Sequence, residues 1–203
     1  MEDNPLMTIA LDPADSLIRK WFQQRSASER TKVVEIGGRY GFASTSLVKE
    51  QRELSFEVRC DSLDFLNRGK ALVDAGDGDR IAFTHIPSIF ESCPSADKSN
   101  VLVYVIRNLF WNWADEDVVE ILQKLLPTLK ASPATRILVT DGVSPLPNEY
   151  PPHVEIAYRR RDVTTMTMHN VKQRTQAEWL AMFARVDEAI KVRASRRRRV
   201  CSS

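Results

Sequence analysis

The sequence contains 203 residues with a mass of 23.1 kDa, which corresponds to one domain of ordinary size. Apolar residues make up 43% and charged residues 28%, which are globular values and exclude wholesale disorder and the fibrous classes. The three cysteines (Cys60, Cys93 and Cys201) are scattered and form no C-x-x-C pair, so neither a disulfide framework nor a metal site is expected.

The formal net charge of +2 is unevenly distributed. Residues 191–203 contain six Lys/Arg and no acid, so residues 1–190 carry a net charge of −4. We therefore expect one domain over residues 1–190, followed by a basic, disordered tail over residues 191–203. The arginines at 196–199 can also be read as a nuclear-localisation or nucleic-acid patch. Because no aromatic residues are interleaved with them, we expect no nucleic-acid partner.

The N-terminal residues MEDNPLMTIALDP are acidic and interrupted by prolines, unlike a secretory signal. No apolar run approaches the ~18 residues that are needed to span a bilayer. A cytoplasmic location without a membrane partner is therefore the expectation.

In chain order, short apolar runs alternate with amphipathic stretches. Helices are predicted over residues 13–25, 42–51, 62–75, 116–130, 154–168 and 175–186. Strands are predicted over residues 32–36, 54–61, 80–86, 101–107 and 135–142. Residues 189–193 are compatible with one last short strand, and Pro127 is expected to kink or end its helix near the last turn.

This alternation predicts βαβ units, and hence a parallel sheet that is covered by helices on both faces. Right-handed crossovers make such a sheet a doubly wound α/β fold. Ligands of these folds bind at the carboxyl ends of the strands, although the fold by itself names no reaction.

A glycine-rich turn, EIGGRYG at residues 35–41, follows the first predicted strand of this alternation. Gly37, Gly38 and Gly41 would let a ligand approach the backbone closely. Asp61 ends the next strand, about twenty residues further on, where a carboxylate can accept hydrogen bonds from ribose hydroxyls. Together these features indicate an adenosine-containing cofactor, with a simple tight turn as the alternative.

The choice of cofactor depends on the spacing within this turn. A dinucleotide site requires G-x-G-x-x-G, whereas position 44 is a serine here. The carboxylate of Glu35 would repel a pyrophosphate but suits the ammonium group of S-adenosylmethionine. We therefore predict S-adenosylmethionine rather than NAD.

Five collinear motifs between about residues 15 and 193 resemble the fungal and plant-type (caffeate-type, class I) O-methyltransferases that use S-adenosylmethionine. The motifs are VVEIGGRYG, LSFEVRCD, VYVIRNLFWNWADEDVVEILQKLLPTLK, RILVTDGVSP and RRRDVTTMTMHNVKQRTQAEW. The resemblance implies a mostly parallel, Rossmann-like sheet that is incomplete at its C-terminal hairpin. It also implies methylation of a phenolic or enolic hydroxyl on an aromatic or polyketide molecule of fungal secondary metabolism.

The resemblance assigns residues to parts of the cofactor. It places the three glycines at the methionine end and Asp61 at the ribose, with Ser88 and Ile89 near the adenine and a basic side chain close by. The full set expected around the cofactor is Glu35, Gly37, Gly38, Gly41, Asp61, Ser88, Ile89 and Arg107.

The family's catalytic pair is missing from this sequence. Trp111 occupies the position of the family's general-base histidine, and an indole nitrogen can only donate a hydrogen bond. Gln173 occupies the position of the glutamate that orients that histidine. His169 is the candidate for a substitute base, while Asp141 and Asp162 look like strand-end or capping residues.

The resemblance further implies a truncated chain, which contains the C-terminal cofactor-binding domain without the N-terminal dimerisation domain. The oligomeric state is therefore left open.

Three functions remain: an O-methyltransferase slowed by loss of its base, a repurposed relative (a pericyclase or an accessory partner), and a remnant without stable function. We favour the first. General-base help contributes about 10²–10⁴-fold, whereas orientation contributes up to ~10 kcal/mol. A substrate that is already ionised would need no base.

Overall fold

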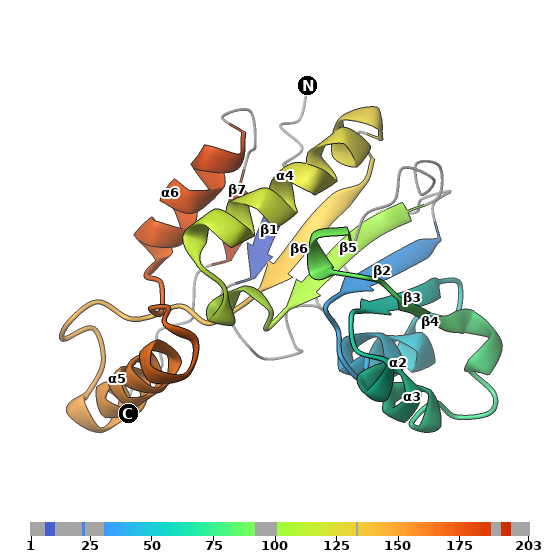
Figure 1. Ribbon diagram of the computed structural model, residues 1–203, viewed down its shortest axis with the longest axis horizontal. Helices are drawn as coiled ribbons and strands as arrows, with labels where there is room; N and C mark the ends of the chain where they lie inside the picture. Colours follow the sequence, from blue (N-terminus) through green and yellow to red (C-terminus); the bar gives the residue numbers. More distant parts are fainter. Residues whose placement is uncertain are drawn as a thin grey trace.

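The computed structural model describes residues 7–10, 22, 31–91, 101–132, 134–187 and 192–195. Within these residues, seven strands form one sheet in the order β4-β3-β2-β5-β6-β1-β7, and every neighbouring pair of strands is parallel (Figure 1). No helix among the described residues is long and apolar enough to cross a membrane.

The strands are β1 (Met7–Ala10), β2 (Lys32–Ile36), β3 (Ser55–Cys60), β4 (Ile81–His85), β5 (Val101–Arg107), β6 (Arg136–Thr140) and β7 (Val192–Ser195). The α-helices are α2 (Phe42–Glu50), α3 (Leu63–Ala71), α4 (Asp115–Ala131), α5 (Pro152–His169) and α6 (Gln176–Val186). Short 3₁₀ helices are η1 (Gly78–Arg80), η2 (Ile89–Glu91) and η4 (Phe110–Asn112).

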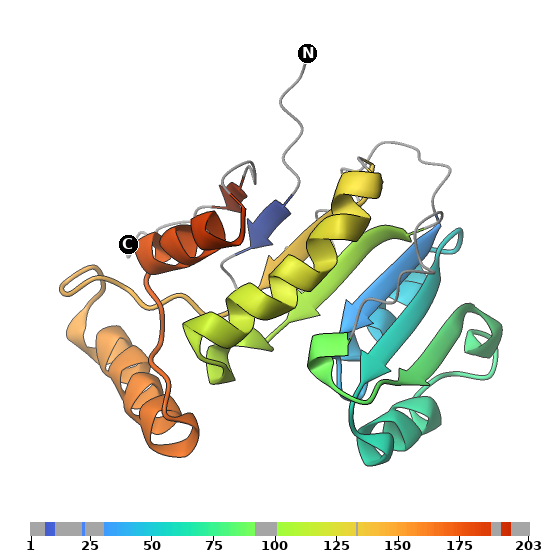
Figure 2. The ribbon, with the colours of Figure 1, turned by 45° about the horizontal axis from the view of Figure 1, so that its top comes forward.

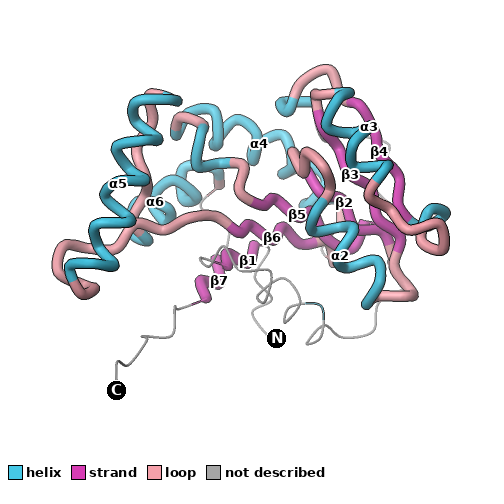
Figure 3. The backbone as a smooth tube through the Cα atoms, turned by 90° about the horizontal axis from the view of Figure 1, so that it is seen from below, coloured by secondary structure: helices cyan, strands magenta, loops and turns pink. Residues whose placement is uncertain are grey.

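The period-2 alternation of the central strands gives the sheet two buried faces. Val34 and Ile36 of β2 belong to the core that α4 and α6 complete, while Val33 belongs to the core that contains α2 and α3. Figure 3 shows α4 and α2 on opposite sides of the sheet. The predicted doubly wound α/β architecture is therefore confirmed.

The five strands predicted between residues 32 and 142 appear as β2 to β6, and five of the six predicted helices appear as α2 to α6. The predicted helix over residues 13–25 lies outside the described residues except for Phe22, which is helical and buried. Helix α4 does not end at Pro127 but continues to Ala131. Its buried residues Leu125 and Leu129, on either side of the proline, hold it against the core.

The sheet beyond β6 departs from the prediction in part: β7 overlaps residues 189–193, which are compatible with one last short strand, whereas β1 is not predicted. β1 pairs with β6, and β7 pairs with β1, both in parallel. The resemblance predicts an incomplete hairpin here, but two strands from opposite ends of the chain extend the sheet instead. Because the edge of β6 presents unpaired backbone groups, any extended segment can satisfy them. Residues 192–195 therefore belong to the sheet rather than to a tail; the rest of residues 191–203 lies outside the described residues.

Helix α5 stands apart from the sheet, beyond the carboxyl ends of β5 and β6 (Figure 2). In this helix, all of which the structure describes, Thr165 is the one buried residue. α5 therefore contributes little to the core and is placed to border a site at that edge.

Candidate cofactor and substrate site

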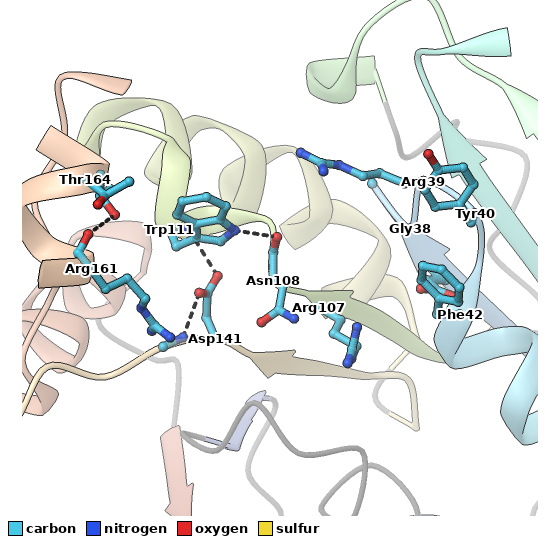
Figure 4. Close-up of a pocket in the computed structure, with 14 residues that line it drawn as sticks. Gly38, Arg39, Tyr40, Phe42, Arg107, Asn108, Trp111, Asp141, Arg161 and Thr164 are labelled. Carbon is cyan, nitrogen blue, oxygen red and sulfur yellow. Dashed lines mark hydrogen bonds between the residues drawn. The ribbon is translucent and has the colours of Figure 1, made fainter. Parts of the chain in front are cut away.

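A cavity of about 470 Å³ opens at the carboxyl ends of β2, β5 and β6 (Figure 4). Four segments line it: the glycine turn after β2, the connection from β5 to α4, the residues after β6, and the C-terminal half of α5. This is the edge of the sheet at which the alternating pattern predicts a ligand. Its volume lies within the ~300–1,000 Å³ range of small-molecule sites.

The glycine turn is held in its path by packing as well as by backbone conformation. Gly37 and Gly41 have φ angles of 66° and 70°, in the left-handed region that favours glycine. A Cβ on Gly41 would lie 2.7 Å from Val58 Cγ2, and one on Gly37 would lie 2.7 Å from Leu109 Cδ1. The Gly37 N–H donates to the Arg59 carbonyl at 2.8 Å, which ties the turn to β3.

Glu35 is the penultimate residue of β2, just before this turn, and is only 2% exposed. Its Oε2 accepts hydrogen bonds from Ser44 N at 2.9 Å and from Ser44 Oγ at 2.6 Å. Burial raises the pKa of the Glu35 carboxyl, although Ser44 and the nearby Arg107 oppose that shift. Glu35 thus links β2 to α2 while it also lines the cavity.

The 3₁₀ helix η4 is held by a buried carboxylate that follows β6. Asp141 is 2% exposed, and its Oδ2 accepts hydrogen bonds from Phe110 N at 2.8 Å and from Trp111 N at 3.1 Å. Its Oδ1 accepts from Gly142 N at 2.7 Å. Burial raises the pKa of Asp141 to about 6, even though these hydrogen bonds favour the ionised form.

A buried arginine holds the same segment from the other side. Arg174 is 3% exposed and donates to the carbonyls of Phe110 at 2.8 Å and Trp113 at 2.7 Å. Its Nε donates to Asp115 Oδ1 at 2.7 Å, and its guanidinium lies 4.9 Å from the ring centroid of Trp179. Arg174 therefore connects η4 and the start of α4 to α6.

Trp111 is carried on this segment and lines the cavity. Its indole Nε1 donates to the Asn108 carbonyl at 2.9 Å, so the ring's single polar group already has a partner. The ring of His169 meets the Trp111 ring edge-to-face, with 5.2 Å between centroids. His169 itself is not among the residues that line the cavity.

Gln173 is buried and contacts α5 rather than Trp111. Its Oε1 accepts hydrogen bonds from Arg161 Nε at 3.3 Å and Arg161 Nη2 at 3.2 Å. Its Nε2 donates to Thr165 Oγ1 at 2.9 Å, and its backbone N–H donates to Asp162 Oδ1 at 2.8 Å. The group that accepts hydrogen bonds from the Arg161 guanidinium is therefore the neutral amide of Gln173.

The predicted ribose and adenine residues lie outside the cavity lining. Asp61 follows β3 and is exposed, and its Oδ1 lies 3.7 Å from Cys60 Sγ. Ser88 Oγ accepts a hydrogen bond from Phe90 N at 3.3 Å, and Ile89 is buried in the core. The cavity thus lies between the glycine turn and α5 and does not extend to these three residues.

The cavity lining brings together five of the predicted site residues, namely Glu35, Gly37, Gly38, Arg107 and Trp111. The predicted residues outside the lining are Gly41, Asp61, Ser88, Ile89, His169 and Gln173.

Three charged residues of the lining, Arg39, Asp141 and Arg161, are not among the predicted site residues. Arg39 lies within the glycine turn that the sequence singles out. Asp141 lies near the C-terminal end of the strand predicted over residues 135–142, where such sheets bind ligands, and that position is a usable signal. Arg161 lies in the middle of a helix with several arginines, so no sequence signal marked it.

Residues 14–186 match the family described as the O-methyltransferase domain. The chain therefore belongs to this family.

The curated relatives include O-methyltransferases from fungi. The protein named O-methyltransferase phnC of Penicillium herquei is 35% identical over 189 residues, which cover 90% of this chain and 44% of that protein. O-methyltransferase sol2 of Alternaria solani is 34% identical over 162 residues, which cover 79% of this chain and 37% of that protein. The chain thus spans less than half the length of these relatives.

Solved structures share the fold at lower identity. The mitomycin 7-O-methyltransferase MmcR superposes with a TM-score of 0.66 at 21% identity, over 85% of this chain and 47% of that one. A structure described as a pericyclic reaction enzyme gives a TM-score of 0.64 at 22% identity, over 84% and 40%. The O-methyltransferase NcsB1 from neocarzinostatin biosynthesis, in complex with S-adenosyl-L-homocysteine and 1,4-dihydroxy-2-naphthoic acid, gives 0.58 at 19% identity, over 85% and 50%.

The packing around the glycine turn predicts that an added side chain there lowers the stability of the fold. Gly41→Ala should lower the free energy of unfolding by about 2 kcal/mol or more, because the left-handed conformation costs about 1–2 kcal/mol and the added Cβ meets Val58. Gly76→Ala is the control, since nothing lies within 4 Å of the added Cβ. Urea unfolding measures both variants. Equal stability of the two would contradict the structural role of the turn.

Asp141 predicts a pH dependence of stability. Its pKa is raised from 3.8 to about 6 on folding, so the folded state holds a proton that the unfolded state has lost. This group's contribution to stability therefore falls as the pH rises from about 4 to about 6. Relative to Asp141→Asn, the wild type should lose on the order of 2 kcal/mol across that window. Urea unfolding at several pH values measures the difference between the two proteins, and a pH-independent difference would refute the assignment.

Proposed function

We propose that this chain binds S-adenosylmethionine and supports transfer of its methyl group to a phenolic or enolic hydroxyl of an aromatic or polyketide molecule of fungal secondary metabolism. The observation that carries the proposal is the cavity at the carboxyl edge of the sheet, bounded by the glycine turn and by Trp111, in a chain of the O-methyltransferase family. The proposal includes a small-molecule substrate, no nucleic-acid or membrane partner, and a cytoplasmic location.

The residues present suit this cofactor. Gly37 and Gly38 leave the cavity wall without side chains, and the Glu35 carboxylate lies beneath them with a charge opposite to that of an ammonium group. Asp61, at the end of the neighbouring strand, is exposed and accessible to ribose hydroxyls. When bound, S-adenosylmethionine supplies a methyl group that is activated by a sulfonium. Ser88, Ile89 and Arg107 complete the proposed cofactor set, as the family pattern implies.

The protein's own contribution to the chemistry is orientation. Trp111 offers apolar area to an aromatic substrate but cannot accept a proton. Asp141 uses its oxygens to hold the backbone of η4, and His169 lies outside the cavity lining. We therefore assign proton loss to the substrate's own acidity rather than to His169.

The loss of the base favours one second candidate function. A relative that keeps the cofactor fold but transfers no methyl group, as a pericyclase or as an accessory partner of a biosynthetic enzyme, would also tolerate Trp111. Titration with S-adenosylhomocysteine combined with a methyl-release assay separates the two. Binding together with turnover supports methyl transfer, while binding without turnover on phenolic and enolic substrates supports the second function.

Asp61 tests the cofactor assignment. Asp61→Ala should weaken S-adenosylhomocysteine binding by about 1–3 kcal/mol, because ribose hydroxyls would be left unpaired. Calorimetry measures the affinity. Asp64→Ala is a matched control, since Asp64 is also exposed and pairs with Arg68 on α3. If Asp61→Ala leaves the affinity unchanged, the assignment of the ribose site fails.

Restoring the missing general base tests the reaction. Trp111→His, with Gln173 kept because its amide faces Arg161 rather than position 111, should raise the rate of methyl transfer to a neutral phenol by about 10²–10⁴-fold, the usual contribution of a general base. The control, Trp111→Phe, removes the indole without adding a base. Incorporation of labelled methyl groups measures the rates. No gain in the first variant would mean that the cavity no longer supports methyl transfer.

A further inference from the structure

Arg161 reaches the cavity floor from α5 because position 142 has no side chain. A Cβ on Gly142 would lie 1.7 Å from Arg161 Nη2, so the guanidinium occupies the space that any other residue would fill. Figure 4 shows the Arg161 side chain extending from α5 toward Asp141. The guanidinium thus lies at the carboxyl end of β6.

The charge of Arg161 has no acidic partner among the residues that the structure describes. Its Nε and Nη2 both donate to Gln173 Oε1, which is neutral. Arg159 on the same helix, by contrast, pairs with Glu155 at 2.8 Å. A neutral amide leaves the positive charge of a guanidinium uncompensated, so Arg161 can attract an anion in the cavity.

The other charged groups of the cavity do not cancel this charge. The lining contains Arg39, Arg107 and Arg161 against Glu35 and Asp141. Both carboxylates are 2% exposed and already accept hydrogen bonds, from Ser44 and from the backbone of η4 and Gly142. Burial also raises the pKa of both carboxyl groups. Neither carboxylate forms an ion pair with Arg161, so its positive charge remains available to a ligand at the α5 side of the cavity.

We propose that Arg161 makes this cavity specific for substrates that carry an anionic oxygen on an aromatic ring, an aromatic carboxylate or an ionised phenol. The proposal deepens the proposed function and rests on it. A guanidinium binds such oxygens through short, charge-assisted hydrogen bonds, in bidentate form for a carboxylate. A phenol that binds in its ionised form also needs no proton acceptor at position 111. The amide at position 173 and the tryptophan at position 111 then suit the same substrate.

Ligand binding to the cofactor-free chain tests the proposal without requiring turnover. The probes are 2-naphthoic acid, which is ionised at neutral pH, and 2-naphthamide, which has the same shape and no charge. By calorimetry, the wild type should bind the acid at least about tenfold more tightly than the amide. Arg161→Gln should abolish that preference and leave amide binding unchanged. Arg160→Gln removes the same charge one residue away, outside the cavity lining, and should retain the preference.

Gln173→Glu gives a second, independent variant. It replaces the amide oxygen that lies 3.2–3.3 Å from two guanidinium nitrogens with a carboxylate, so Arg161 would be neutralised in place. Acid binding should fall about as far as in Arg161→Gln, with amide binding and thermal stability retained. Arg161→Lys should keep part of the preference, because the charge remains but the bidentate geometry is lost.

A second probe pair, 4-nitrophenol and 4-nitroanisole, separates the two sources of the anion. If Arg161 binds an ionised phenol, binding near neutral pH should increase the visible absorbance of the nitrophenolate, and Arg161→Gln should remove that increase.

A preference for naphthoate alone assigns Arg161 to a carboxylate, and a response of nitrophenol alone assigns it to the phenol; either supports the proposal. It is overturned if the wild type binds neither anion, or if Arg161→Gln and Gln173→Glu leave anion binding unchanged. S-adenosylhomocysteine titration of the same samples reports separately on the proposed function.

Discussion

The buried side chains of Asp141 and Arg174 hold the segment between β5 and α4 through hydrogen bonds to its backbone, and the geometry of the site depends on them. Asp141 accepts the backbone N–H groups of Phe110 and Trp111, and Arg174 donates to the carbonyls of Phe110 and Trp113. Each ion is costly to bury, and each is stabilised by several hydrogen bonds from the chain. Removal of Asp141 would leave the N–H groups of Phe110, Trp111 and Gly142 without this acceptor. Removal of Arg174 would leave the carbonyls of Phe110 and Trp113 and the carboxylate of Asp115 without this donor.

The hydrogen bonds of Asp141 and Arg174 join three parts of the chain that are distant in sequence. Asp141 follows β6, Arg174 precedes α6, and the held segment leads from β5 into α4. The backbone at Trp111 is therefore placed rigidly at the ligand edge. Trp111, whose side chain cannot accept a proton, thus lies on a segment whose backbone is fixed by buried hydrogen bonds.

The residues at positions 111 and 173 are physically related through Arg161. An amide at position 173 leaves Arg161 charged, whereas a carboxylate there would pair with it. A charged Arg161 favours an oxygen that arrives ionised, and an ionised oxygen makes a general base unnecessary. Under the proposed function, Trp111 and Gln173 therefore suit a substrate that binds as an anion. Because the chain spans less than half of its curated relatives, the activity of the whole protein remains a proposal.

Local patterns in the sequence determined the alternation of β2 to β6 with their helices, the glycine turn, and the edge at which a ligand would bind. These features follow from hydrophobic periodicity and from residues that end strands, which act over a few neighbouring positions. The tertiary structure alone decided that β1 and β7 extend the sheet in parallel, and that Gln173 faces Arg161 rather than Trp111. Each of these depends on contacts between different elements of the fold, and no local pattern encodes which group will satisfy a backbone edge or face a buried side chain.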